Sequence, residues 1–168
     1  MQTLIDEKAI AERIATLGKE ITEFYRGEEL TVVALLHGSV IFSADLLRKI
    51  ELPLWFDSLC LASYVDRASS GRFEVRSRLK LPISGRHALL IDDILDSGRT
   101  LAHAEEYLRA AGAVSVRSCV LLDKKVERAP GGTAKPDWHG FEIENVFVAG
   151  YGLDHSEYLR NLPSIVAV

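Results

Sequence analysis

The sequence is poor in cysteine, has no long apolar run and carries no strong charge of either sign. Only two of its 168 residues are cysteine. Both lie in apolar stretches, so we expect Cys60 and Cys119 to be buried, reduced and structural. No apolar run approaches the roughly 20 residues needed to cross a bilayer, and the charged segment MQTLIDEKAIAERI at the start lacks the apolar core of a secretory signal. We therefore expect a soluble, cytoplasmic protein without a membrane partner.

The charge balance is mildly acidic, with 20 Lys and Arg against 24 Asp and Glu and a net charge of −4. This balance provides no general positive field for gathering nucleic acid, so an anionic ligand must be held by local groups. With 48% hydrophobic residues, a chain of this length can bury a core. We expect a single domain over residues 1–168.

Helical and strand-like apolar patterns alternate along the chain. A helix that ends near Gly27 is predicted by the spacing of Ile10, Ile14, Leu17, Ile21 and Phe24. Further helices are predicted at 42–50 and 100–111. Strands are predicted at 31–36, 55–63, 87–91, 114–122, 146–149 and 165–168, with an exposed antiparallel strand at 73–79 and a Pro- and Gly-rich loop at 125–140. The alternation predicts an α/β fold with an open, mostly parallel sheet flanked by helices, whose ligands bind at the carboxyl ends of the strands.

The most informative segment runs from Ala88 to Leu101. An apolar strand leads into two adjacent acids, Asp92 and Asp93, and then into a third acid, Asp96, and a small polar turn. Main-chain N–H groups of residues 97–99 can converge on a phosphate at the start of the following helix, and the Thr100 hydroxyl adds a donor. Acids beside a phosphate cradle suit sugar hydroxyls or a hard cation such as Mg²⁺. The pattern therefore predicts a phosphorylated sugar held together with a metal.

Two other interpretations fit parts of this segment. Asp96 or Ser97 could simply cap the helix, with the acidic pair solvated, but capping does not explain two charges directly after an apolar strand. A receiver-type domain also binds Mg²⁺ with an acidic pair. In that class the pair follows the first strand, whereas here it comes in the middle of the chain.

Residues 92–100 resemble the phosphoribosyl-diphosphate (PRPP) signature of type I phosphoribosyltransferases. From about residue 31 to 163 the chain resembles, more specifically, the hypoxanthine-guanine phosphoribosyltransferases. The matching segments are LLHGSVIFSADLL, Ser63-Tyr64, LLDK and KPDWHGFEI…VFVAGYGLDHSEYLRNLP. The resemblance implies a small hood built from N- and C-terminal segments, with purine-binding residues at about 135–168, and a lid loop at about 64–72. It also implies purine salvage, in which Mg²⁺-dependent transfer from PRPP to hypoxanthine or guanine gives IMP or GMP and diphosphate.

The resemblance further implies roles for individual residues. Asp96 would act as the catalytic general base near the purine. The ribose of PRPP would be bound by Asp92 and Asp93, and the 5′-phosphate by Asp96, Ser97, Gly98, Arg99 and Thr100. Diphosphate would be bound by His37, Gly38, Ser63, Tyr64 and Arg160. The purine would be bound by Lys124, Phe147, Val148 and Asp154, and Mg²⁺ by Asp154, Asp92 and Asp93.

Three positions leave alternatives open. His37 stands where the family commonly has a lysine, so its ring could make diphosphate binding pH-dependent or could donate a single hydrogen bond. Lys125 follows Lys124 directly, and either could face the purine. Phe147 could stack on the base or belong to the core.

The same fold also admits other functions. A regulator that senses PRPP or nucleotides and binds RNA or DNA would use a basic face. The run from Arg67 to Lys80 is interrupted by Glu74 and lacks interleaved aromatics. We therefore do not expect nucleic acid as a partner. A xanthine-preferring enzyme is a further alternative, and the relatives suggest a homodimer or homotetramer.

Overall fold

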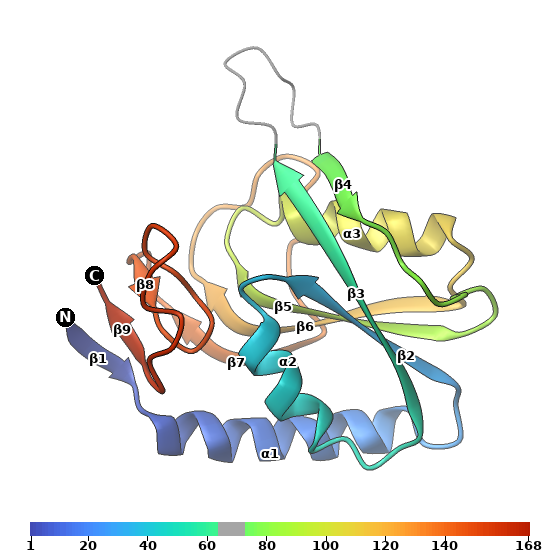
Figure 1. The fold of residues 1–168 in the computed structure, drawn as a ribbon, viewed down its shortest axis with the longest axis horizontal. Coiled ribbons are helices and arrows are strands. Elements are labelled where there is room, and N and C mark those ends of the chain that lie inside the picture. Colours follow the sequence, from blue (N-terminus) through green and yellow to red (C-terminus); the bar gives the residue numbers. More distant parts are fainter. Residues whose placement is uncertain (64–72) are drawn as a thin grey trace.

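The computed structural model describes residues 1–63 and 73–168, which form a central sheet with helices on both faces and a small second sheet (Figure 1). The central sheet has the strand order β4-β3-β2-β5-β6-β7. Its strands are β2 (Leu30–Leu36), β3 (Leu54–Ser63), β4 (Phe73–Ser77), β5 (His87–Leu95), β6 (Ser115–Lys124) and β7 (Trp138–Ile143). All neighbouring pairs are parallel except β3 and β4. The predicted open, mostly parallel α/β sheet is confirmed.

Both faces of the central sheet are buried. The helices α1 (Glu7–Phe24) and α2 (Val40–Leu47) cover one face, and α3 (Arg99–Ala110) covers the other. Along β5, Leu89 and Ile91 pack on the α1 and α2 side, whereas Ala88 and Leu90 pack on the α3 side. A strand buried on both faces has no polar alternation, which is why β5 appears in the sequence as a continuous apolar run.

Helix α1 follows its predicted pattern except at its last residue. The Asp6 carboxylate accepts a hydrogen bond from the Ala9 N–H and caps the helix. Four of the five predicted apolar positions are fully buried, but Phe24 is 49% exposed. Its ring lies edge-on to Trp138, with centroids 5.2 Å apart. The predicted helix is therefore present, and Phe24 is left partly exposed because the helix ends there, at the margin of the sheet.

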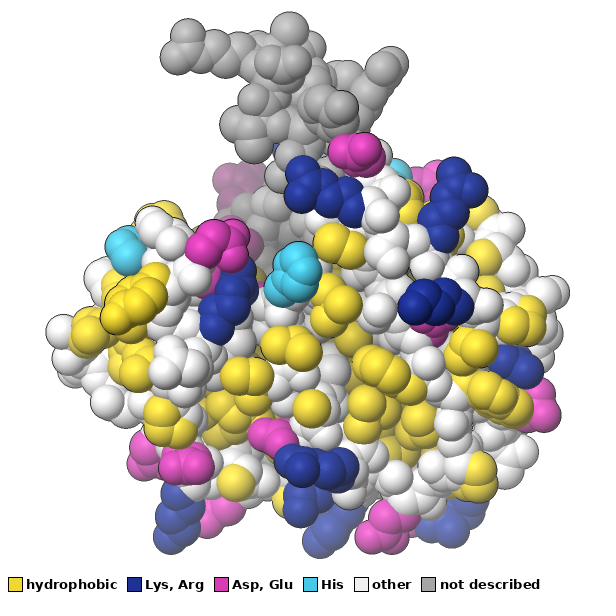
Figure 2. Space-filling view, in the orientation of Figure 1, with side chains coloured by type: hydrophobic (Ala, Val, Ile, Leu, Met, Phe, Trp, Pro, Cys, Tyr) yellow, Lys and Arg dark blue, Asp and Glu magenta, His cyan; other side chains and the backbone are white. Residues whose placement is uncertain are grey.

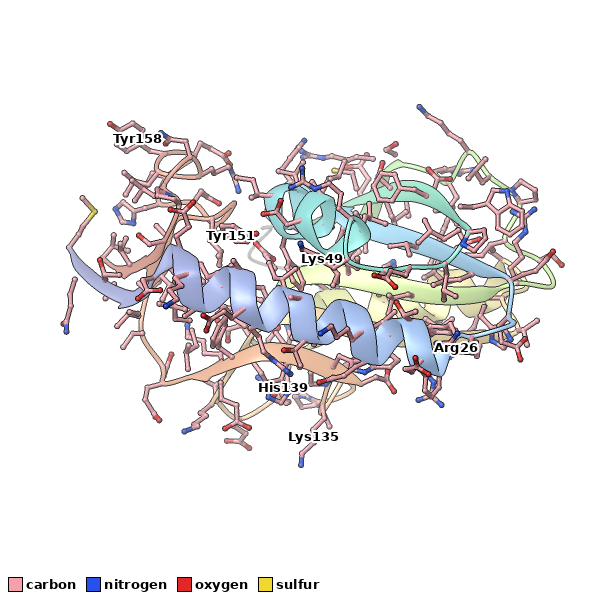
Figure 3. The ribbon with its side chains drawn as sticks, turned by 90° about the horizontal axis from the view of Figure 1, so that it is seen from below. Arg26, Lys49, Lys135, His139, Tyr151 and Tyr158 are labelled. Carbon is pink, nitrogen blue, oxygen red and sulfur yellow. The ribbon has the colours of Figure 1, made fainter. Side chains whose placement is uncertain are left out.

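The predicted loop at 125–140 is wrong at its end, where β7 begins at Trp138 and pairs in parallel with β6. Glycine is depleted in strands, so the presence of Gly140 is the reason that the sequence pattern did not predict this strand. A Cβ at this glycine would lie 2.5 Å from the Leu121 carbonyl oxygen, so no larger residue fits. The Arg13 guanidinium of α1 donates to the carbonyls of His139 and Gly140 and covers this strand; Figure 3 shows His139 beneath α1.

The second sheet joins the two ends of the chain. It is antiparallel, in the order β1 (Gln2–Ile5), β9 (Ile165–Ala167) and β8 (Val148–Ala149), and Figure 1 shows both termini beside it. We refer to residues 1–5 and 148–168 as the hood. The sequence did not predict β1, and the strand predicted at 146–149 lies here, outside the central sheet. The Tyr151 hydroxyl donates to the Asp45 carboxylate of α2 and ties the hood to the main body (Figure 3).

Three further predictions have mixed outcomes. Cys119 is buried, but Cys60 is only partly buried, because it lies near the edge of the sheet; both are free thiols. No helix in the described parts of the chain is long and apolar enough to cross a membrane. The predicted lid at about 64–72, including Tyr64, lies outside the described residues. Of Ser63 only its backbone position at the end of β3 is described.

Candidate active site

A pocket of about 290 Å³ lies at the carboxyl ends of β2 and β5, where the sequence places the site. It is lined by Gly38, by the acidic pair and by most of residues 94–101. Strand β5 continues to Leu95, four residues past its predicted end, so the acidic pair lies within the strand. Side chains alternate along a strand. Accordingly Asp92 is buried, at 8% exposure, and its neighbour Asp93 is half-buried.

Main-chain N–H groups donate to both carboxylates of the acidic pair, and the two carboxylates repel each other. The Asp93 N–H donates to Oδ1 of Asp92, and the Ile94 N–H donates to Oδ1 of Asp93, both at 2.9 Å. Burial raises the pKa of the Asp92 carboxyl well above its usual range, and the charge of Asp93 raises it further. Burial also raises the pKa of Asp93, which the Arg160 guanidinium opposes. A ligand that offers hydroxyl donors would stabilise both carboxylates here.

The turn after β2 packs closely against this pair. The peptide bond between Leu36 and His37 is cis. A Cβ at Gly38 would lie 1.7 Å from Oδ2 of Asp93, so only glycine fits. A Cβ at Gly152 of the hood would lie 2.3 Å from the Gly38 carbonyl oxygen, which brings the hood into contact with the turn. The His37 side chain is exposed, and its ring forms no hydrogen bond with any other residue that the structure describes.

The predicted phosphate turn leads directly into α3. Gly98 has a φ of +78°, a conformation that glycine adopts without strain. Ser97, Gly98 and Thr100 line the pocket. The Arg99 side chain instead lines a wider hollow of about 900 Å³ along α3, away from the acidic pair. Arg99, like Gly98, can therefore serve the pocket only through its main-chain N–H, which lies 3.4 Å from the Ser97 hydroxyl oxygen as a donor to it.

Lys124 and Lys125 point in different directions. The Lys124 side chain, at the end of β6, is 9% exposed, and its Nζ lies 3.1 Å from Oδ2 of Asp96. The Lys125 ammonium donates to Glu144 at the surface, where both side chains are at least half exposed. The geometry therefore favours Lys124 as the lysine that faces a ligand.

Phe147 lies at the entrance to the hood and not in the core. It is 78% exposed, and Nζ of Lys124 lies 5.5 Å from the centroid of its ring. Its carbonyl accepts a hydrogen bond from the N–H of Val168, and the next residue, Val148, is buried in β8. The open ring face agrees with a stacking role and excludes the alternative in which Phe147 is a core residue.

Asp154 and Arg160 form an ion pair in the hood. Nη2 of Arg160 lies 2.9 Å from Oδ1 of Asp154, and its Nη1 donates to the Gly152 carbonyl. No three His, Cys, Asp or Glu side chains within residues 1–63 and 73–168 lie close enough together to hold a metal ion. The predicted set of Asp92, Asp93 and Asp154 is thus not a single cluster, because Asp154 pairs with Arg160 in the hood while the other two lie in β5.

One residue at this site, Arg128, was not predicted from the sequence. The guanidinium of Arg128 donates to the carbonyls of Leu95, Asp96 and Lys124 and pairs with the Asp123 carboxylate. An arginine in a loop rich in Gly and Pro looks like a solvated charge, so no local signal marks it. Its partners are carbonyl groups, which sequence patterns do not report.

Comparison with known proteins agrees with this geometry. The model of the phosphoribosyl transferase domain family matches residues 1–156. A hypoxanthine-guanine phosphoribosyltransferase of Aquifex aeolicus is 39% identical over 170 residues, covering 100% of this chain and 94% of that protein. A solved structure of a hypoxanthine phosphoribosyltransferase from Staphylococcus aureus has a TM-score of 0.94 at 33% identity, covering 100% of this chain and 91% of that one.

Some relatives are much longer. The chain is 39% identical over 165 residues to the bifunctional protein TilS/HprT of Listeria innocua, and this match covers 98% of the chain but only 25% of that protein. The chain thus spans about a quarter of the length of these longer relatives. The family match, the near-complete coverage of the shorter relatives and the shared fold all agree with the resemblance found in the sequence. The chain belongs to the phosphoribosyltransferase family.

Proposed function

We propose that the chain transfers the phosphoribosyl group of PRPP to hypoxanthine or guanine and releases IMP or GMP and diphosphate. The observation that carries this proposal is the meeting of Lys124, Asp96 and the exposed ring of Phe147 beside the pocket. A 6-oxopurine needs a donor for its oxygen, an acceptor for a ring proton and a flat apolar surface. The names of the relatives support the same substrates.

The sugar phosphate fits at the strand ends. The ribose hydroxyls donate to Asp92 and Asp93, whose pKa values are raised by burial and, for Asp92, by the charge of Asp93, so that added donors would stabilise their charged forms. The 5′-phosphate lies against the main-chain N–H groups of residues 97–99 and the Thr100 hydroxyl, at the positive end of α3. This assignment uses Arg99 through its backbone alone.

The purine lies between the main body and the hood. Its six-membered ring stacks on Phe147, and the edge of the base faces the backbone of Val148 and the region of Asp154. Lys124 carries three donors and no acceptor, so it suits a 6-oxo group and rejects the 6-amino group of adenine. Lys124 can therefore separate 6-oxopurines from adenine, but hypoxanthine, guanine and xanthine all carry the oxygen that it would bind.

The reaction needs little covalent chemistry from the protein. The bond from C1′ to diphosphate breaks, the bond from C1′ to the purine nitrogen forms, and the proton on purine N7 passes to the Asp96 carboxylate. Positive charge develops on the ribose and faces the two acids of β5, which stabilise it. Catalysis is therefore mostly positioning and electrostatics.

Diphosphate is bound by the turn at His37 and Gly38, by Arg160 and by Mg²⁺. A planar guanidinium suits phosphate oxygens. Mg²⁺ prefers oxygen ligands and usually takes one or two carboxylates, with waters and substrate phosphates completing its shell. Asp154, or the pair in β5, can therefore hold it even though the three do not cluster. When bound, the ion neutralises charge on the departing diphosphate.

Other assignments from the family stay proposals. These are a cytoplasmic location, a homodimer or homotetramer, diphosphate contacts from Ser63 and Tyr64, and the lid. A nucleic-acid-binding regulator gains no support on the face in Figure 2, where Lys and Arg side chains are scattered among Asp and Glu side chains. A direct assay of each base distinguishes a xanthine-preferring enzyme from one that uses hypoxanthine or guanine.

The test is turnover of PRPP with Mg²⁺ and each of hypoxanthine, guanine, xanthine, adenine and uracil. Formation of IMP and GMP with release of diphosphate, and no product from adenine or uracil, supports the proposal. Turnover of uracil alone, or of no base, overturns it. A clear preference for xanthine would leave the reaction class intact and correct the substrate.

A further inference from the structure

The carbonyl groups of residues 95–98 accept hydrogen bonds from the loop between β6 and β7, and the Gly98 carbonyl also accepts one from the Ala102 N–H of α3. Nη1 of Arg128 donates to the carbonyls of Leu95 and Asp96, at 3.2 and 2.6 Å. The N–H of Ala129 donates to the Ser97 carbonyl at 2.9 Å, and the N–H of Thr133 donates to the Gly98 carbonyl at 3.0 Å. Four successive carbonyls, from residues 95 to 98, therefore have partners in this loop.

These hydrogen bonds fix the direction of the N–H groups on the other side of the turn. A peptide unit is planar and trans, so its N–H points opposite to its C=O. Holding the carbonyls of Asp96, Ser97 and Gly98 therefore orients the N–H groups of Ser97, Gly98 and Arg99. These are the three main-chain donors assigned to the 5′-phosphate. The loop thus determines where the donors point although it does not touch the ligand.

Arg128 also joins this turn to the end of β6. The same Nη1 donates to the Lys124 carbonyl at 2.8 Å, and Nη2 pairs with the Asp123 carboxylate. The two side chains of this ion pair are only 16% and 15% exposed, so water screens them little. A planar guanidinium with five donors can span these partners at once, and a lysine ammonium cannot.

We propose that Arg128 is a positioning residue for the 5′-phosphate site, acting by orienting the N–H groups of the phosphate turn. The proposal rests on the proposed function for the location of the phosphate. The proposal adds a residue that contacts no substrate but controls the affinity for the ribose 5-phosphate part of PRPP. The alternative is a purely structural role, in which Arg128 stabilises the fold without affecting the geometry of the turn.

Arg128→Lys is the first test, because it keeps the charge and loses the spanning geometry. We expect its Kd for ribose 5-phosphate, measured by titration calorimetry, to rise about tenfold to a hundredfold, the loss expected when a hydrogen bond to a charged group is no longer made. The KM for PRPP should rise in parallel, and that for hypoxanthine should change much less. Arg13→Lys is the matched control, because Arg13, on α1, also donates to main-chain carbonyls but contacts β7 and not the phosphate turn.

Gly132→Ala disturbs the same turn without touching Arg128. A Cβ at Gly132 would lie 2.5 Å from the Ser97 carbonyl oxygen, so the turn or the loop must shift. We expect this variant to weaken ribose 5-phosphate binding as well, and to shift the amide signal of Gly98 in a ¹H–¹⁵N spectrum. Thermal unfolding of each variant identifies temperatures at which all of them are folded.

The outcomes separate the two proposals. Weaker binding in Arg128→Lys and Gly132→Ala, with Arg13→Lys like the wild type, supports the positioning role. A lower melting temperature with unchanged Kd for ribose 5-phosphate overturns it and leaves Arg128 structural. If the wild-type protein neither binds ribose 5-phosphate nor turns over any base, the proposed function fails instead, whatever the variants do.

Discussion

The ammonium group of Lys124 lies 3.1 Å from Oδ2 of Asp96 and 5.5 Å from the centroid of the Phe147 ring. The lysine side chain is nearly buried, whereas Asp96 is 55% exposed. A cation with little water around it therefore depends on an acid that solvent reaches freely. The arrangement joins β6, the turn before α3 and the residue that precedes the hood at one point, and the first predictions concern these residues.

Removing the Lys124 charge should weaken purine binding and selectivity together. In Lys124→Gln we expect kcat/KM for hypoxanthine to fall about tenfold to a hundredfold, since a hydrogen bond to a charged group is worth about 1.5–3 kcal/mol. Discrimination against adenine should narrow, because a glutamine amide both donates and accepts. Steady-state kinetics with both bases measure the change.

Lys125→Gln is the neighbouring control for that measurement. Lys125 pairs with Glu144 at the surface, and such exposed pairs contribute about 0–1 kcal/mol. Its kinetics should match those of the wild type. Equal losses in the two variants would contradict the assignment of Lys124 to the purine.

Asp96→Asn should separate catalysis from binding of PRPP. The amide keeps the shape of the side chain but cannot accept the purine proton. We expect kcat to fall by about 10²–10⁴, the usual contribution of a general base, with little change in the Kd for PRPP. Asp137→Asn, which alters a carboxylate bonded to Ser118 and Arg117, serves as the control. A loss of PRPP binding as large as the loss of turnover would make Asp96 a structural residue.

Asp92→Asn should stabilise the fold at neutral pH while reducing activity. Burial and the charge of Asp93 raise the pKa of Asp92 in the folded state, so the folded protein favours the protonated form. The cost of the buried charge is therefore absent below the ordinary Asp pKa of about 3.9, and it grows as the pH rises through the folded-state pKa.

The variant should accordingly unfold at higher urea concentration than the wild type at pH 7, and the difference should shrink toward pH 4. The stabilisation at pH 7 should be about 1 kcal/mol or more, the size of other stabilising substitutions. Urea unfolding at several pH values measures it. A difference that is constant with pH, or larger in acid, would contradict the account of the acidic pair.

Gly38→Ala should damage both the fold and the site. Its Cβ would lie 1.7 Å from Oδ2 of Asp93, so the carboxylate must move. Overpacking of this kind costs about 1–3 kcal/mol, and we expect a lower free energy of unfolding and weaker PRPP binding. Gly27→Ala is a control for PRPP binding: its φ of +84° makes alanine strained there, but no atom lies near its Cβ position, so it should lower stability without weakening PRPP binding. Full PRPP affinity in Gly38→Ala would show that the turn is not part of the site.

The central part of the fold was predictable because burial leaves a clear pattern. Strand β5 is apolar on both faces, and the acids that interrupt this pattern at Asp92 and Asp93 mark the edge of the sheet where the pocket lies. The same logic failed for β7, because Gly140, a residue type depleted in strands, interrupts its pattern. At position 140 the close approach of the Leu121 carbonyl requires glycine, although glycine has a low strand propensity.

The site was predictable where a residue uses its own side chain or a special backbone conformation. Lys124, Asp96 and Gly98 are of this kind. Arg128 was not predictable, because its role depends on carbonyl groups that a fold brings to it. The relation of Asp154 to the acidic pair was also hidden, since a spacing of about 60 residues in sequence fixes no distance in space.

The central position of β9 in the small sheet has a consequence for the last residues of the chain. Strand β9 pairs with β1 on one side and with β8 on the other, and the N–H of Val168 donates to the Phe147 carbonyl. Residues 165–168 thereby support the aromatic platform proposed for the nucleobase. Loss of the β9 pairing would therefore disturb base selection before it disturbed binding of the sugar phosphate.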